Sequence, residues 1–534
     1  MKTKYWRIGE PCVWGTGAAL AVTLLIALTL IVVVMVNGLG VFWPSNLHEM
    51  TLQDGSKLMG EQIRTESIPE EDAQRIQFKI GNRDLYGLDF RWVDEADIVS
   101  RTLPRHAVAL EREEYGNFYG YLDTVETAGM LESESFSSPY DELESLRDVV
   151  LDIKEEVEEK AERVSDLSYD AEQVRLEQLE VLHNGGSVEG SDYLALEDEL
   201  EQLNKEFDVH LREQTALELR MKEVKATFHD ASGRSRDIVV AEIVRMYRPN
   251  QMPFISKCFF YADKLVELIF GEPRESNTEG GLFPAIFGTV MLIFVMSLFS
   301  FPLGVIAAIY LREYAREGLM VRIVRIAVNN LAGIPSIVYG IFGLGFFVYG
   351  IGSSIDMLFF AERLPTPTFG TGGILWASLT LSLLTVPVVI VSTEEALGAI
   401  PREMREGSLA LGATKFQTLY RILVPMASPG IMTGLILAMA RAAGEVAPLM
   451  ITGVVKLAPA LPIDGNFPFL HLDRKFMHLG FHIFDIGFQS PNVEAAKPMV
   501  FVTTLLLVLI VLVMSSVAIH LRNKMKKRYT FGTF

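Results

Sequence analysis

The sequence predicts an all-α polytopic membrane protein of six spans, with one large water-facing insertion between the first and second spans. Long runs without Asp, Glu, Lys or Arg are the first sign, because each can cross about 30 Å of hydrocarbon as a helix. The second sign is a formal net charge of −19 on a chain that is 49% hydrophobic, which indicates regions of different solvent preference. The third is the grouping of basic residues into segments that fall on one side of a six-span arrangement.

Six segments are candidate spans. Five runs carry no charged residue: 17–36, 281–311, 326–355, 364–393 and 498–519. A sixth span is expected at about 430–455 from its length and flanks, although Arg441 and Glu445 lie within it. The first run follows a basic N-terminus, as the apolar part of a signal peptide would. Its length and the lack of a small-x-small cleavage site nevertheless predict a retained anchor.

The orientation follows from the basic residues, which are enriched in cytoplasmic segments. Four basic segments fall on the same side of the six spans: Lys2, Lys4 and Arg7; Arg312, Arg316, Arg322 and Arg325; Arg402, Arg405, Lys415 and Arg421; and Arg522, Lys524, Lys526, Lys527 and Arg528. Both termini are therefore expected to be cytoplasmic, with residues 38–280 on the opposite side. Cys12 and Cys258 are then separated by the membrane, so no disulfide is expected.

The insertion is predicted to contain a small β-rich domain, built from residues 45–140 and 225–250. Four strand-like runs each surround turn residues, as the paired strands of a hairpin do: 50–63, 75–93, 107–124 and 225–246. Residues 254–280 then begin with an amphipathic segment. That segment is expected either to lie along the outer membrane–water boundary or to pack as an ordinary helix.

Between these runs, residues 141–224 are predicted to form an antiparallel coiled-coil hairpin. Apolar residues recur at spacings of three and four on both sides of a break at 184–186. Charged residues occupy the other faces, so a solvated spacer or scaffold is the ordinary interpretation and a specific docking arm the alternative. His210 and Gln214 fall at core positions, where we expect them to set register, since no partner ligands stand at metal-site spacing.

The cytoplasmic loop at 393–429 carries the most informative motif. Glu406 is followed six residues later by Gly412, and nine residues then lead to the Ile-x-Val-Pro sequence at 422–425. This pattern resembles the EAA loop of ABC importer permeases. A short helix is expected at about 401–411, ended by Gly412, which can take a left-handed conformation and reverse the chain.

The resemblance implies a role for this helix, because in that family it inserts into a groove on the ATPase subunit. Glu403, Arg405 and Glu406 would supply polar contacts, and Leu409 and Leu411 apolar ones. The ordinary alternative is an amphipathic cytoplasmic helix capped by glycine. The departures from the family pattern are few: Gly407, Ser408 and Val424 stand where Ala, Ala and Leu are usual.

Three further segments resemble the PstA family of phosphate permease subunits: 283–290 (FPAIFGTV), 331–345 (LAGIPSIVYGIFGLG) and 441–453 (RAAGEVAPLMITG). The resemblance covers 281 to about 521 and departs at Val446, where Thr is usual. It implies the type I fold of ABC importer permeases for the first helix, within 1–37, and for 281–522, followed by a cytoplasmic tail at 523–534. The insertion exceeds the short loop of compact members, so its role is not implied.

The same resemblance implies a permease subunit of an ATP-driven phosphate importer in a bacterial inner membrane, with residues 38–280 in the periplasm. The implied partners are a PstC-like permease subunit, a PstB-like ATPase dimer, a PstS-like periplasmic phosphate-binding protein and membrane lipid, with no nucleic acid. Two alternatives stay open. One is a permease for sulfate or molybdate, and the other is a membrane-anchored scaffold or sensor acting through the coiled-coil hairpin.

Arg441 and Glu445 are the expected substrate-pathway residues, because a separation of four places them on one face of a helix. The planar guanidinium matches phosphate oxygens and stays charged in a low dielectric. Glu445 can pair with Arg441 when no anion is present, which offsets burial and keeps phosphate from binding too tightly. The alternative is a buried pair that only orients two subunits. In the family, both positions have been linked to transport.

Ser336 is the third pathway candidate. Pro335 and Ser336 are expected to break the third span early, so that free backbone N–H groups and the Ser336 hydroxyl can face an anion. The alternative, to which we give equal weight, is that this segment has no role in anion binding and that its glycines only allow close helix packing. They are Gly333, Gly340, Gly343 and Gly345.

No motif for bond-breaking chemistry occurs in the sequence. There is no GxxxxGK[ST] loop for ATP phosphates, and neither a nucleophile elbow nor an HExxH pair. We therefore expect a transport subunit rather than an enzyme, with no catalytic residue, metal site or cofactor of its own. ATP and Mg²⁺ would be bound by the partner ATPase.

Overall fold

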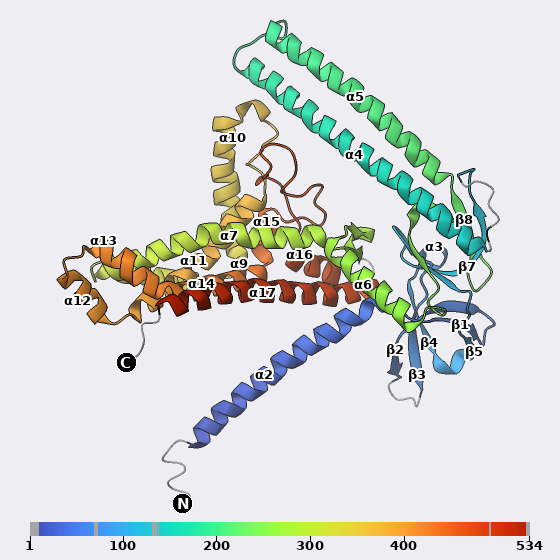
Figure 1. Cartoon of the computed structure of the whole chain (residues 1–534), viewed down its shortest axis with the longest axis horizontal. Helices are drawn as coiled ribbons and strands as arrows, with labels where there is room; N and C mark the ends of the chain where they lie inside the picture. The colour runs from blue at the N-terminus through green and yellow to red at the C-terminus, as the bar shows by residue number, and fades with distance from the viewer. Residues whose placement is uncertain (1–9, 69–72, 131–135, 137, 491–492, 530–534) are drawn as a thin grey trace, which may run out of the picture.

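The computed structural model describes residues 10–68, 73–130, 136, 138–490 and 493–529. The basic residues Lys2, Lys4 and Arg7, and positions 530–534 of the expected tail, lie outside the described residues. Figure 1 shows three parts: a bundle of long helices, two small sheets at one end of it, and a two-helix arm that extends from the sheets.

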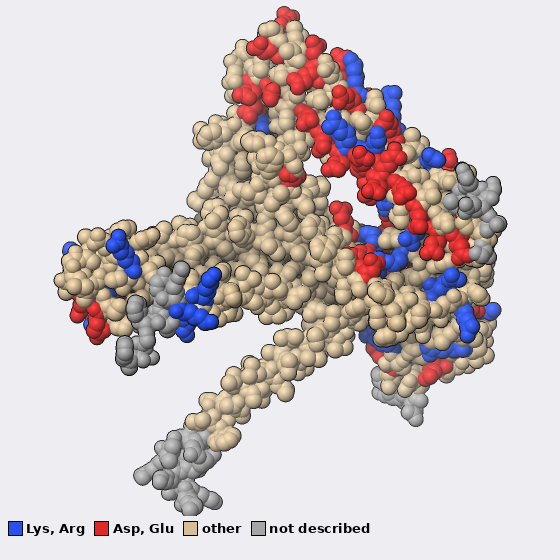
Figure 2. Space-filling model, in the orientation of Figure 1, with Lys and Arg blue, Asp and Glu red and all other residues tan. Residues whose placement is uncertain are grey.

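Six helical segments in the described part of the chain are long and apolar enough to cross a membrane. They are Cys12–Phe42, Phe283–Tyr314, Ser336–Phe359, Ile374–Gly398, Lys415–Ala443 and Val493–Lys527. On the face shown in Figure 2, the long middle stretch of the bundle is almost free of charged side chains. The predicted number of spans is confirmed, and the chain is a multi-pass membrane protein.

The third span begins later than predicted. Instead of one helix over 326–355, α8 (Leu319–Leu331) ends before Pro335 and α9 (Ser336–Phe342) starts after it. Proline offers no backbone N–H and disfavours helical conformation at the residue before it, so the two helices stay separate. The span then continues through the π-helical η6 (Gly343–Gly352) into α10 (Ser353–Phe359).

The fourth and fifth spans are also displaced. The helix α11 (Ile374–Gly398) covers only the later part of the expected run. The predicted bounds 430–455 for the fifth span are wrong, because one helical segment runs from α13 (Lys415–Thr418) through η8 (Leu419–Leu423) to α14 (Val424–Ala443). Long basic side chains at the end of a span can reach water, so the charges at 415–421 did not mark where the helix begins.

Small residues hold the bundle together. The helix α7 (Phe283–Ile309), which continues as η5 (Tyr310–Tyr314), packs along α11, and α11 packs along α14. A Cβ at Gly304 would lie 2.7 Å from Val389, so this close approach requires glycine. The first helix, α2 (Glu10–Leu39) with η1 (Gly40–Phe42), diverges from the bundle and packs mainly on α17 (Val493–Tyr529) near one end (Figure 1).

Two antiparallel five-stranded sheets form the β region. Their strand orders are β4-β3-β2-β1-β5 and β10-β6-β7-β8-β9. The strands are β1 (Leu47–Leu52), β2 (Lys57–Ser67), β3 (Gln74–Lys79), β4 (Phe90–Asp94), β5 (Ile98–Thr102), β6 (Val108–Arg112), β7 (Phe118–Glu126), β8 (Lys225–His229), β9 (Ser235–Val239) and β10 (Ile243–Tyr247). The arm leaves the second sheet between the paired strands β7 and β8, where Glu126 lies opposite Lys225.

The remaining elements are short connections. They are α3 (Arg83–Tyr86), η2 (Glu95–Asp97), η3 (Val240–Glu242), α6 (Phe254–Phe270), β11 (Pro273–Arg274), η4 (Glu275–Asn277), β12 (Glu279–Gly280), η7 (Ala361–Arg363), α12 (Arg402–Ala410), α15 (Ala447–Thr452), α16 (Leu479–Phe484) and η9 (Asp485–Gln489). In Figure 1, α12 and α13 lie at one end of the long spans and the two sheets at the other.

The arm consists of α4 (Pro139–His183) and α5 (Ser191–Lys222), which pack along each other as a helical hairpin (Figure 1). Two ion pairs cross between the helices: Lys160 with Glu213 at 2.7 Å, and Arg163 with Glu206 at 3.8 Å. Residues 139–222 hold 25 Asp and Glu against 9 Lys and Arg, so the arm carries most of the net charge of −19. Figure 2 shows this acidic surface.

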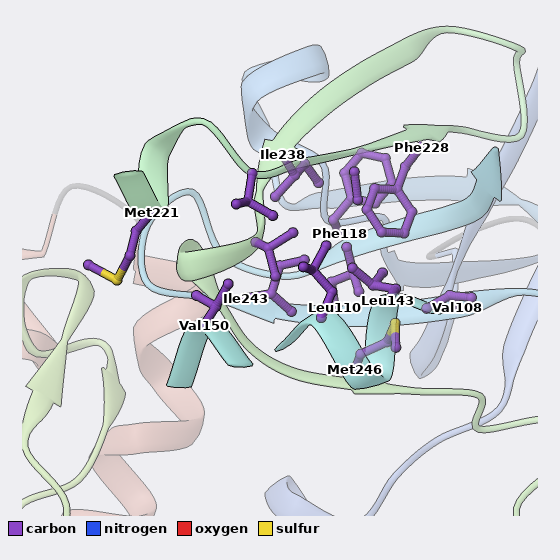
Figure 3. Close-up of a cluster of buried hydrophobic side chains, with 14 of the residues drawn as sticks. Val108, Leu110, Phe118, Leu143, Val150, Met221, Phe228, Ile238, Ile243 and Met246 are labelled. Carbon is purple, nitrogen blue, oxygen red and sulfur yellow. The ribbon is translucent and has the colours of Figure 1, made fainter. Parts of the chain in front are cut away.

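The base of the arm belongs to the hydrophobic core of the second sheet. Leu143 and Val150 of α4 and Met221 of α5 are buried there against Phe118 and Phe228 (Figure 3). Large apolar side chains buried from both the helices and the sheet fix the direction of the arm. The base of the arm is therefore continuous with the core of the second sheet.

Candidate functional site

Arg441 and Glu445 form an ion pair at a helix break. Arg441 Nε lies 3.7 Å from Glu445 Oε1. The prediction that both residues share one helix is wrong, because α14 ends before Glu445 and α15 starts after it. Gly444 has a low helix propensity, and Pro448 favours the first turn of a new helix. The two side chains are 32% and 22% exposed, so the pair reaches the surface of this chain.

Ser336 opens α9, which packs directly on α15. A Cβ at Gly340 would lie 2.7 Å from Pro448 Cα, so glycine is needed for this approach. Tyr339 donates its hydroxyl to the Leu331 carbonyl oxygen at 2.8 Å and so bridges the break before α9. The break before α9 and the break before α15 thus lie in neighbouring segments. Close packing through glycine is observed here, and the role of Ser336 as an anion donor stays a prediction.

The helix α12 matches the short helix expected at about 401–411. It is ended by Gly412, whose φ of +88° is in the left-handed region. The Gly412 N–H donates to the Leu409 carbonyl oxygen at 3.0 Å, and the Ala413 N–H donates to the Ser408 carbonyl oxygen at 3.2 Å. A buried hydrogen bond of 2.9 Å between the Ser408 and Thr418 hydroxyls then holds α12 against α13. The predicted reversal of the chain at Gly412 is confirmed.

Arg405 is engaged inside the chain. Its Nη2 lies 2.9 Å from Glu313 Oε1, at the end of the second span, and also donates to the Leu397 carbonyl oxygen at 2.6 Å. Its Nη1 donates to the Ile400 carbonyl oxygen at 2.8 Å. Arg405 therefore braces α12 against the ends of α7 and α11. Glu313 was missed by the sequence reasoning, although an acid directly beside Arg312 in a mainly basic segment was a usable signal.

The outer surface of α12 and α13 combines charge with exposed apolar side chains. Glu403 and Glu406 are exposed, as is Leu409. Leu411 is 91% exposed at the tip of the turn. Phe416 and Tyr420, which sequence reasoning overlooked, are exposed and stack with ring centroids 6.2 Å apart. Aromatic residues inside a polar loop could have identified them. Such a mixed surface is typical of a protein contact.

A buried polar cluster lies where the insertion rejoins the bundle. Lys456 Nζ is 3.2 Å from Asp485 Oδ2, and His482 Nε2 is 3.1 Å from the Asn277 carbonyl oxygen. Burial lowers the pKa of both His478 and His482 to about 4, so both imidazoles are neutral at pH 7. Two histidines four residues apart in an apolar segment were the signal for this cluster, which the sequence analysis did not use.

Metal ligation finds no support in the arrangement of side chains. Within the described ranges, no group of three or more His, Cys, Asp or Glu side chains is placed to hold a metal ion. Cys12 and Cys258 are both exposed free thiols.

Comparison with known proteins finds similarity in the second half of the chain. Residues 300–527 match the family described as binding-protein-dependent transport system inner membrane component. The chain is 32% identical over 223 residues to the probable ABC transporter permease protein YqgI of Bacillus subtilis, a match that covers 40% of this chain and 70% of that protein.

Similarity to proteins named for phosphate transport lies in the same range. The chain is 37% identical over 182 residues to the phosphate transport system permease protein PstA of Yersinia pestis, covering 34% of this chain and 56% of that one. It is 34% identical over 197 residues to the probable PstA of Methanocaldococcus jannaschii, covering 36% and 63%. The chain spans about half to just under two thirds of most curated relatives that it matches.

Among solved structures, the chain is similar to the MetNI methionine ABC transporter in an inward-facing conformation. The TM-score is 0.35 at 20% identity, covering 46% of this chain and 95% of that chain. A bacterial alginate ABC importer gives a TM-score of 0.35 at 16% identity, covering 50% and 84%.

Proposed function

The chain belongs to the family of binding-protein-dependent transport system inner membrane components, and we propose that it is the permease subunit of an ATP-driven phosphate importer. The observation that carries this proposal is the Arg441–Glu445 pair at a break between two apolar helices. The pair lies inside the stretch that is similar to the phosphate permeases.

Phosphate binding is assigned to Arg441. A guanidinium offers several N–H donors in a planar fork that fits phosphate oxygens, and it stays protonated in a low-dielectric path. Glu445 competes with the anion for the same donors, so binding stays weak enough for release. The 3.7 Å separation and the partial exposure of both side chains suit a pair that opens when an anion arrives. Ser336, at the start of α9, would add a hydroxyl donor.

Coupling to ATP hydrolysis is assigned to α12. Leu409 and Leu411 would enter a groove on the ATPase, with Glu403 and Glu406 at its rim, because these side chains are exposed on the outer surface of the helix. Arg405 and Gly412 would hold the helix and its turn in place. Closure of two PstB-like ATPase subunits would pull α12 and its counterpart in a PstC-like permease together and switch the path between its two sides.

The orientation in the membrane completes the proposal. Both termini and α12 face the cytoplasm of a bacterial cell, and residues 38–280 face the periplasm, where a PstS-like protein delivers phosphate. The placement of α12 and the sheets at opposite ends of the spans supports this arrangement (Figure 1). The acidic arm is a coiled-coil hairpin on the periplasmic side.

The test is phosphate uptake by cells in which Arg441→Gln replaces the native chain. Losing a charge-assisted hydrogen bond costs about 1.5–3 kcal/mol, so uptake is expected to fall about 10- to 150-fold. Arg421→Gln, at an exposed position on the same helical segment, is the matched control and should leave uptake unchanged. Protein level and co-purification of the ATPase, identified by mass spectrometry, should be normal in both variants. Unchanged uptake in Arg441→Gln would refute the pathway role, and inhibition by sulfate or molybdate would redirect the substrate assignment.

A further inference from the structure

The helix α6 connects the last strand of the second sheet to the second span, and both of its ends are attached to span ends. Trp43, directly after η1 at the end of the first span, lies 5.6 Å from the Phe254 ring and 6.1 Å from the Tyr261 ring. The Leu282 N–H, one residue before α7 begins, donates to the Leu268 carbonyl oxygen at 2.8 Å. The helix therefore lies at the level where two spans leave the bundle, on the side of the sheets (Figure 1).

One side of α6 is tied to the second sheet by charge pairs. Lys264 Nζ lies 2.6 Å from Glu111 Oε2, and Glu267 Oε2 lies 2.9 Å from Arg245 Nη1. Burial alone would raise the pKa of Glu267, but Lys264 and Arg274 beside it outweigh burial and lower it to about 2. This carboxylate is thus ionised and paired at any physiological pH. The charged side chains of the helix are thus paired or hydrogen-bonded inside the chain.

The other side of α6 is apolar and uncovered. Four large side chains there are between 56% and 74% exposed: Ile255, Phe259, Val266 and Phe270. Positions 255, 259, 266 and 270 fall on one side of a helix. They are separated by four or eleven residues, and side chains at these spacings point in nearly the same direction from the helix axis. A continuous exposed face of two phenylalanines, an isoleucine and a valine is unusual on a surface in contact with water.

The residues beside this apolar face indicate that lipid covers it. The first span, which approaches α6 at Trp43, is exposed over most of its length in this chain and needs lipid around it. Lys257 is turned away from the apolar face and donates to the Pro44 carbonyl oxygen at 3.0 Å. With Trp43 it lines a cavity of about 350 Å³ beside the helix. Tryptophan and lysine at a span end are typical of the headgroup level of a bilayer.

We propose that α6 lies in the outer leaflet of the membrane, with the face formed by Ile255, Phe259, Val266 and Phe270 among lipid acyl chains. The charge pairs on its other side then hold the second sheet, and with it the arm, at a fixed height above the bilayer. Tyr169 of the arm donates to the Phe467 carbonyl oxygen in the loop after α15, at 2.7 Å, so that height also sets how the arm meets the bundle. This inference depends on the chain being a membrane protein and is independent of the transported substrate.

The test uses spin labels on the full chain reconstituted in nanodiscs of phosphatidylethanolamine and phosphatidylglycerol. In a Cys12→Ser, Cys258→Ser background, single cysteines replace Phe259 or Val266, and collision rates with oxygen and with a water-soluble nickel chelate are compared. The two controls are exposed apolar residues: Phe294→Cys in the middle of α7 for lipid, and Leu219→Cys on the arm for water.

The expected oxygen-to-nickel ratio at 259 and 266 is close to that of Phe294→Cys and at least about threefold above that of Leu219→Cys. Nickel collisions as frequent as at Leu219→Cys would overturn the proposal by showing that the face is in water. Protection from both reagents would also overturn it, because another protein surface would then cover the face.

Discussion

Replacing Gly412 with alanine is expected to loosen α12. The φ of +88° lies in the left-handed region, where an L-residue with a Cβ costs about 1–2 kcal/mol. No atom lies within 4 Å of the position that the new Cβ would take, so steric overlap adds nothing to this cost. A cost of this size raises the population of the opened helix about 5- to 30-fold, since each 1.4 kcal/mol is a factor of ten.

Gly407→Ala is the matched control for this substitution. Gly407 lies inside α12, and its Cβ position is also free of atoms within 4 Å. Alanine inside a helix is more favourable than glycine by roughly 0.5–1 kcal/mol, so this variant should stabilise α12. Gly412→Asn should fall between wild type and Gly412→Ala, because asparagine tolerates the left-handed conformation better.

Hydrogen exchange of the peptide covering residues 402–418, followed by mass spectrometry on the solubilised chain, measures these differences directly. Exchange should be about 5- to 30-fold faster in Gly412→Ala and slower in Gly407→Ala than in wild type. If Gly412→Ala exchanges at the wild-type rate, the left-handed turn does not support the helix and the reasoning fails. Phosphate uptake should fall in the same order if α12 transmits the work of the ATPase.

Three other perturbations test separate contacts. Glu313→Gln removes the charge 2.9 Å from Arg405 and should weaken the contact that braces α12 by about 1–3 kcal/mol. A double-mutant cycle with Arg405→Gln, measured by hydrogen exchange of α12, should show energetic coupling between the two residues. Additive effects would contradict the brace. The buried His478 and His482 have pKa values near 4 in the folded chain, against 6.5 when unfolded. Their contribution to the free energy of unfolding is therefore fully present above about pH 6.5. It is lost as the pH falls toward 4, by about 3 kcal/mol for each histidine. Thermal unfolding at pH 7.5 and 4.5 measures the loss, and His482→Gln should flatten it; a pH-independent midpoint would be inconsistent with buried neutral imidazoles. Shortening the arm by joining Lys160 to Glu213 through the native turn 184–187 keeps its buried base and removes Tyr169. Hydrogen exchange should then accelerate at residues 361–363 and 464–471, which the arm contacts, while the sheets keep wild-type exchange; unchanged loops would show that the arm does not restrain them.

Some features of this protein were determined by short stretches of sequence. A bilayer requires about twenty apolar residues at each crossing, and this requirement is met locally. Five runs without charge, and a sixth apolar stretch recognised by its length and flanks, were therefore enough to count six spans. The turn at Gly412 was predictable for a similar reason, because a left-handed residue after a helix is a local preference of glycine. The alternation of three and four in the arm likewise indicated two helices with a break between them.

Other features were decided by contacts between distant residues. Arg405 was predicted to face a partner, yet it lies against Glu313, which is 92 positions away, and no periodic pattern in the sequence links the two. The ends of the third, fourth and fifth spans depended on where neighbouring helices and water could accommodate charge and proline. Charge-free runs therefore misplaced the third and fourth spans, and apolar length misplaced the fifth. Strands β7 and β8 pair although the whole arm separates them in the sequence. The helix α6 exposes its apolar face because the second sheet occupies the polar one. These ion pairs and strand pairings are decided only in the folded chain, because each residue is stabilised by a neighbour that lies far away in the sequence.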